Sequence, residues 1–238
     1  MCSFSGYYEL STNSIRLIYS TFLWGTIIPN LQLGKEPRQR YISTQAGVKR
    51  QRNIRSEGSM DLLEFATEMF EEYRSRLYTY LDGLTTEELN WRLDSSANSI
   101  AFIVWHTARV EDRWFQVFCQ GKADLWIEDG WFDKLGMDKN QPIAKYKPKE
   151  LEDFPILTMG ELKSYFEVVR AGTQKFLVNI STDELGKAPG RSPFPESSSA
   201  SAFAKFTIQR MFRQLIQEEM QHLGQVGILR GLQRGLDK

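Results

Sequence analysis

The sequence predicts an all-α protein: a four-helix bundle with a long connection between helices 2 and 3, preceded by a poorly ordered N-terminal extension. Three observations predict this fold. Four segments repeat apolar residues at intervals of three and four, which is the pattern of an amphipathic helix. No stretch of useful length alternates apolar and polar residues, so no sheet is expected. The segment between the second and third patterns is long enough to cross the length of a bundle.

Residues 1–59 differ in composition from the rest of the chain. They hold eight basic residues against three acids, and polar clusters such as ISTQAGVKRQRNIRSEGS. Their apolar run IRLIYSTFLWGTII is shorter than the roughly 20 residues that span a bilayer. We expect residues 1–59 to be poorly ordered or to precede the natural start, with an Arg-rich targeting peptide as the alternative. Residues 60–238 are then the domain.

The four helices follow in order. The first begins near Met60, after Ser59 as a candidate N-cap, and its apolar stripe reaches Leu84. The other three are predicted over about residues 98–120, 159–179 and 201–232. The first and third helices end in similar sequences, LDGLTTEEL and LVNISTDEL, each with a hydroxyl residue and a glutamate spaced as in a capping box. This likeness leaves two interpretations open, a chain of two similar halves, each of helix, capped turn and helix, or a chance similarity between two common capping boxes.

Composition and motif content exclude several classes of partner and active site. The formal net charge is zero, and basic residues outside the extension do not cluster with aromatic ones, so nucleic acid is not an expected partner. No membrane partner is expected either. Two cysteines exclude a disulfide framework and fit a reducing, cytoplasmic location. The sequence shows neither a Ser/His/Asp arrangement nor a phosphate-binding glycine-rich loop.

Both histidines of the chain interrupt apolar runs. His106 lies in SIAFIVWHTARVEDRWF, and His222 lies in EEMQHLGQVGILRG. On the last helix Glu218, His222 and Gln225 fall on a stripe expected to face the bundle interior. Glu218 and His222 are four residues apart, the spacing at which one helix presents two ligands to one ion. Glu219 lies about 60° from His222 around the helix axis, near the edge of this stripe.

Spacing alone leaves two interpretations open. His106, Glu218 and His222 would form a metal site of two histidines and one carboxylate, with open positions for water or substrate. Alternatively, each histidine is a hydrogen-bonded core residue, and a buried glutamate pairs with an arginine. The arginines available for such a pair are Arg109, Arg113 and Arg213.

Over about residues 60–236 the chain resembles the DinB-like (also called YfiT-like) superfamily. The resemblance rests on LTTEELNWRLDSSANSIAFIVWHTARVEDRWF, DLWIEDGWF and EEMQHLGQVGILRG. It implies a four-helix bundle that holds a divalent metal, zinc or nickel, through His106, Glu218 and His222. Many relatives have histidine where this chain has Glu218, whereas the mycothiol-dependent maleylpyruvate isomerase branch has glutamate. Since a carboxylate is a competent zinc ligand, this departure leaves the site usable.

The resemblance also implies a function. Characterised relatives are metal-dependent transferases or isomerases that use thiols such as bacillithiol, mycothiol or glutathione, so the expected partners are a small-molecule thiol and an electrophile. Glu219 or Gln225 would orient a ligand, a water or the substrate, with an ordinary hydrogen bond as the alternative. Trp126 and Trp131 would cover the site, with core packing as their alternative. The competing hypothesis is a non-catalytic bundle, a homodimer acting in stress response or as a binding module, in which any metal is structural.

Overall fold

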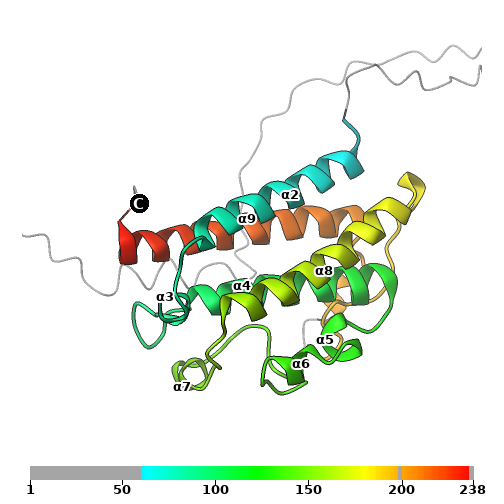
Figure 1. Cartoon of the computed structure of the whole chain (residues 1–238). Helices are drawn as coiled ribbons and strands as arrows, with labels where there is room; N and C mark the ends of the chain where they lie inside the picture. The colour runs from blue at the N-terminus through cyan, green and yellow to red at the C-terminus, as the bar shows by residue number, and fades with distance from the viewer. Residues whose placement is uncertain (1–59, 198–199, 236–238) are drawn as a thin grey trace, which may run out of the picture. The chain divides into compact units, whose positions relative to one another are not determined.

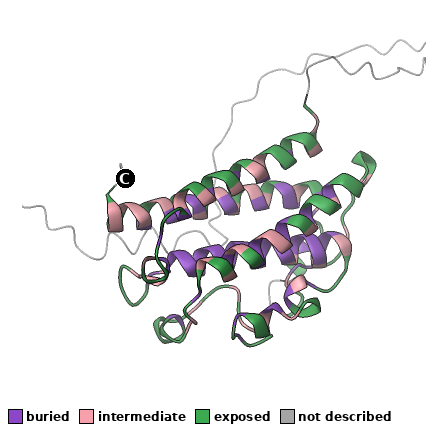
Figure 2. Cartoon of the chain, viewed as in Figure 1, coloured by how far each residue is buried: buried purple, intermediate pink, exposed green. Residues whose placement is uncertain are grey.

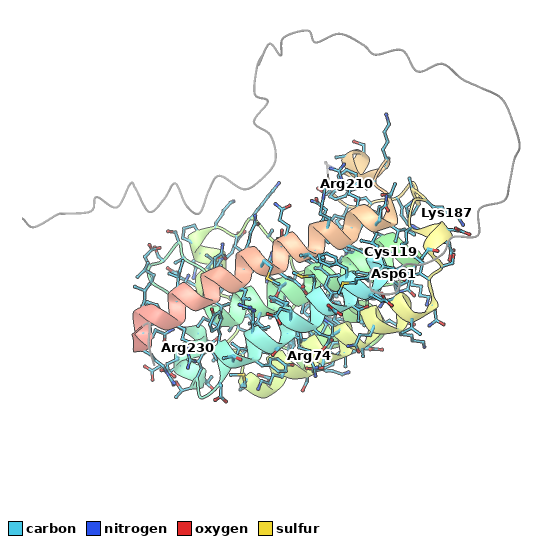
Figure 3. All side chains as sticks on the ribbon, turned by 90° about the horizontal axis from the view of Figure 1, so that it is seen from above. Asp61, Arg74, Cys119, Lys187, Arg210 and Arg230 are labelled. Carbon is cyan, nitrogen blue, oxygen red and sulfur yellow. The ribbon has the colours of Figure 1, made fainter. Side chains whose placement is uncertain are left out.

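The computed structural model describes residues 60–197 and 200–235, and the prediction for residues 1–59 lies outside them. Within the described residues every regular element is a helix, so the all-α class is confirmed (Figure 1). Four long helices form the bundle, and α9 runs along it from Arg210 near one end to Arg230 near the other (Figure 3). Their bounds are α2 Leu62–Leu81, α4 Ile100–Asp112 continued by the π-helix η1 Arg113–Gln120, α8 Met159–Asn179 and α9 Ile208–Arg234.

Helices α2 and α9 pack together, as do α4 and α8, and α4 also packs on α9. The predicted long connection between the second and third long helices is present, and it carries three short helices, α5 Leu125–Glu128, α6 Trp131–Lys134 and α7 Pro148–Glu152. The remaining short elements are α3 Thr86–Asn90, η2 Thr182–Glu184 and η3 Ala200–Phe203. No helix in the described parts is both long and apolar enough to cross a membrane.

Helix ends follow local capping, with two shifts from the predicted bounds. The first helix is capped by Asp61, whose carboxylate accepts hydrogen bonds from two backbone amides of the first turn, and it ends before the positive-φ residue Gly83. The last helix begins at Ile208, seven residues later than the predicted start, because residues 200–203 form a separate 3-10 turn. The predicted bounds of the third helix are confirmed, with Thr158 as its N-cap.

Helix α4 is covered by α8, α9 and the short helices α3 and α5, and all of its residues are buried (Figure 2). This explains the nearly continuous apolar run of residues 100–105, since a helix covered on all sides needs no polar face. The same burial extends to the charged residues Arg109, Glu111 and Asp112 at the end of α4. Each therefore requires a charged or hydrogen-bonding partner inside the protein.

The connection between α4 and α8 is fastened to α4 by buried polar groups. The Asp112 carboxylate accepts hydrogen bonds from the backbone amides of Leu125, at 2.9 Å, and Trp126, at 3.0 Å. Arg109 Nη1 donates to the Asp124 carboxylate at 3.2 Å, and the same carboxylate caps α5. These bonds attach the first residues of the connection to the end of α4. Later residues of the connection lie beside His106.

Candidate metal centre

His106 on α4 and the pair Glu218 and His222 on α9 converge on one point. The Nε2 atoms of His106 and His222 lie 3.4 and 3.3 Å from Oε1 of Glu218. The centroids of the two imidazole rings are 4.8 Å apart. One donor atom from each residue lies within 4.8 Å of the others, so the three residues could hold a metal ion. The predicted approach of the two histidines across the bundle is therefore present.

The second nitrogen of each ring already has a partner. Nδ1 of His106 lies 2.7 Å from the backbone carbonyl oxygen of Ile143, and Nδ1 of His222 lies 2.9 Å from Oε1 of Gln225. Because carbonyl and amide oxygens only accept hydrogen bonds, each Nδ1 carries a proton and donates it. In the neutral rings the Nε2 lone pairs then point toward Glu218. Such outer hydrogen bonds are the usual means of fixing the tautomer and orientation of a metal-binding histidine.

The Glu218 carboxyl is ionised at neutral pH. Burial raises its pKa, but hydrogen bonds and charge from His106 and His222, present when their Nε2 atoms also carry protons, outweigh this effect and bring the pKa down to about 2. When neither Nε2 carries a proton, two nitrogen lone pairs and a carboxylate face and repel one another at these distances. Positive charge between the three groups, from protons on the Nε2 atoms or from a bound cation, therefore stabilises the arrangement.

The three residues fit a divalent metal. Zinc bonds of about 2.0 to 2.1 Å in tetrahedral geometry place neighbouring donor atoms about 3.4 Å apart. The two Nε2 to Oε1 distances, 3.4 and 3.3 Å, agree with this spacing. The site is also accessible, since the Glu218 side chain is 32% exposed and the His222 side chain 15%. Three protein ligands with access from outside are typical of a catalytic site, whereas a structural site is usually closed by four.

The structure corrects the predicted rotation of the last helix. Glu219, expected near the edge of the buried stripe, lies at its centre and is 1% exposed, whereas Glu218, His222 and Gln225 are only half-buried. Glu219 is hydrogen-bonded to Arg170 of α8, and no contact joins it to the metal-ligand candidates within the described residues. The pairing of a buried glutamate with an arginine is present, but the arginine is none of the three considered from the sequence.

Sequence reasoning missed Arg170, although a signal for it existed. Arg170 follows Phe166 by four residues and precedes Leu177 by seven, so it lies on the apolar stripe of the third helix. A cation on such a stripe requires buried anions opposite it. The amide oxygen of Gln225 accepts from His222, a contact that fits both the predicted orienting role and the ordinary hydrogen bond considered as its alternative.

Trp126 and Trp131 lie in the core, packed on Tyr165 of α8 at centroid distances of 5.7 and 5.3 Å. Trp126 is completely buried, and its Nε1 donates to the backbone carbonyl of Lys139. Neither tryptophan contacts His106, Glu218 or His222 in the contacts among the described residues. These contacts agree with core packing, which was the alternative to covering the site for both tryptophans.

A later part of the connection approaches the centre. The backbone carbonyl of Ile143 accepts from His106, and Tyr146 packs edge-on against Phe102 at 5.0 Å. The Phe102 ring in turn stacks on His106, with an angle of 6° between their planes. The sequence offered no signal for Ile143, because its contribution is a backbone oxygen that every residue possesses.

The fold and this site define a helical-bundle protein with a candidate two-histidine, one-carboxylate metal centre. Residues 69–226 match the DinB superfamily, and the chain therefore belongs to that superfamily. It is similar in fold to a solved structure described as a conserved protein from Enterococcus faecalis, with a TM-score of 0.59 and 20% sequence identity over 73% of this chain and 98% of that chain. A comparison with curated proteins gives no match.

Proposed function

We propose that the chain binds a divalent metal, zinc or nickel, through His106, Glu218 and His222. The observation that carries this proposal is the convergence of two imidazole Nε2 atoms on one Glu218 oxygen, with each Nδ1 already used as a donor. Imidazole and carboxylate ligands suit zinc, and imidazole also suits nickel. Membership of the DinB superfamily supports the same interpretation.

The proposed reaction is the transfer or isomerisation of an electrophile with a low-molecular-weight thiol. When bound, a divalent metal would favour the thiolate form of that thiol, which is the nucleophile, at neutral pH. The chain's own part is to orient the two imidazoles through Ile143 and Gln225 and to supply the negative charge of Glu218. The partial exposure of Glu218 and His222 supports an approach for the thiol from outside.

The experiment is elemental analysis of protein purified without a histidine tag, followed by turnover assays with a panel of thiols and electrophiles. We expect about one zinc or nickel ion per chain, as a single three-ligand site requires. Turnover should stop when the metal is removed by a chelator and return when it is added back. A full complement of metal with no turnover for any pair would favour the non-catalytic alternative, and protein that takes up no divalent metal would contradict the proposal itself.

Replacing Gln225 with leucine is expected to weaken metal binding by about 10- to 100-fold. The Nδ1–H of His222 would lose its acceptor, and outer hydrogen bonds to metal-binding histidines typically account for this much affinity. Isothermal titration with zinc measures the change. Gln225→Glu, which keeps an acceptor, should bind nearly as well as the native chain. Gln221→Leu, at an exposed position of the same helix, is the matched control. Equal affinities for all four proteins would count against this orienting contact.

A further inference from the structure

A buried ion cluster joins three helices of the bundle beside the candidate metal centre. Arg170 Nη2 of α8 donates to Glu111 of α4 at 3.1 Å and also to Glu219 of α9. The three side chains are between 0% and 1% exposed. The Arg170 guanidinium also lies over the rings of Phe70 and Phe166, at 5.2 and 5.1 Å. One nitrogen atom thus links α4, α8 and α9 inside an aromatic pocket.

Stability alone does not explain this cluster. Removing an arginine and two glutamates from water costs several kcal/mol per ion, and well-packed apolar residues in their place are often equally or more stabilising. Several of their polar atoms, Arg170 Nε and Nη1, Glu111 Oε1 and Glu219 Oε2, have no hydrogen-bond partner within the described residues. In some proteins a buried polar or ionic group selects one packing arrangement over its alternatives.

The two glutamates that Arg170 binds, Glu111 and Glu219, lie close in sequence to the candidate metal ligands. Glu111 is five residues beyond His106 on α4, and Glu219 directly follows Glu218 on α9. Sliding α9 by one helical turn would separate Glu218 from His106, and the same movement would separate Glu219 from Arg170. Apolar contacts between α4 and α9 are non-directional and can form again one turn away, whereas a hydrogen-bonded ion pair specifies one register.

We infer that Arg170 is a positioning residue for the metal centre. Through Glu111 and Glu219 it fixes the register and rotation of α9 against α4, and so holds the Nε2 atoms of His106 and His222 on one oxygen of Glu218. Arg170 touches none of these three residues and acts only through the helices that carry them. This inference rests on the proposed binding of a metal by His106, Glu218 and His222.

The test replaces the whole cluster with apolar residues, as Arg170→Met, Glu111→Leu and Glu219→Leu in one chain. Because no charge is left unpaired, we expect cooperative thermal unfolding of the metal-free triple variant close to that of the native protein. We expect its affinity for Co²⁺ to fall by about tenfold or more, and the visible absorption spectrum of bound Co²⁺ to change, since a loosened ligand set alters the coordination geometry. A purely structural cluster would leave that spectrum unchanged.

Two further variants make the result decisive. Arg234→Met removes an ion pair between the last residue of α9 and Glu88 of α3, away from the centre, and should leave Co²⁺ affinity and spectrum unchanged. Arg170→Lys keeps the charge but shortens the reach to Glu111 and Glu219 and replaces the planar guanidinium that lies over Phe70 and Phe166, so it should weaken Co²⁺ binding even where the triple variant fails to fold. A folded triple variant, or Arg170→Lys, with native affinity and spectrum would overturn the inference. A native chain that gives no Co²⁺ spectrum would instead overturn the proposed metal site, and the inference with it.

Discussion

Replacing His222 with alanine is expected to abolish metal uptake and leave the bundle folded. The substitution removes one of three candidate donors and leaves His106 and Glu218, too few for a stable site. The cost in stability should be small, about 1 kcal/mol, because the His222 side chain is partly exposed and its partner Gln225 can turn to water. Metal content after equilibration with zinc, and the thermal unfolding of the metal-free proteins, measure the two effects.

The matched control is Gln221→Ala, one position earlier on an exposed part of α9, which should bind zinc as the native chain does. Glu218→Gln should also lose the metal, since the carboxylate supplies the only negative charge among the three candidates. If His222→Ala still bound one zinc ion per chain, His222 would not be a ligand. A purely structural histidine would show its loss chiefly as a lowered unfolding temperature.

Replacing Trp126 with alanine is expected to lower the free energy of unfolding by about 3 to 5 kcal/mol, the usual cost of truncating a fully buried large aromatic residue. Trp126 is 0% exposed and packs on Trp105 and Tyr165, at 6.0 and 5.7 Å, while the Arg109 guanidinium lies over its ring at 4.5 Å. Its Nε1 also donates a hydrogen bond to the backbone carbonyl of Lys139 at 3.0 Å. Loss of the indole should therefore loosen the connection between α4 and α8. Unfolding in urea, followed by circular dichroism, measures the loss.

Ile127→Ala in the same short helix is the control, because Ile127 is 43% exposed and should cost less than about 1 kcal/mol. Zinc affinity should change much less than stability in Trp126→Ala, since Trp126 makes no contact with the candidate ligands among the described residues. The opposite pattern, native stability with lost thiol turnover, would favour the predicted covering of a substrate by Trp126.

The sequence by itself determined the helices and the residues that meet at the candidate centre. Amphipathic periodicity and caps such as Thr158 act within a few neighbouring residues, so local pattern was enough for the all-α class and for the bounds of the third helix. Glu218 and His222 share one side of α9 through the geometry of the helix alone. Since the chain has only two histidines, both in apolar runs, their meeting across the bundle could also be predicted.

Only the tertiary structure decided which face of α9 is most deeply buried and which groups complete the site. Glu218 and Glu219 are adjacent and chemically alike. Glu219 rather than Glu218 is the more deeply buried of the two because it pairs with Arg170, which lies 49 positions before Glu219 on another helix. The orientation of His106 depends on the backbone carbonyl of Ile143, which leaves no mark in the sequence. Periodicity gives the direction of a side chain around its own helix, but the free energy of burying a charge depends on the counter-charge that another helix supplies.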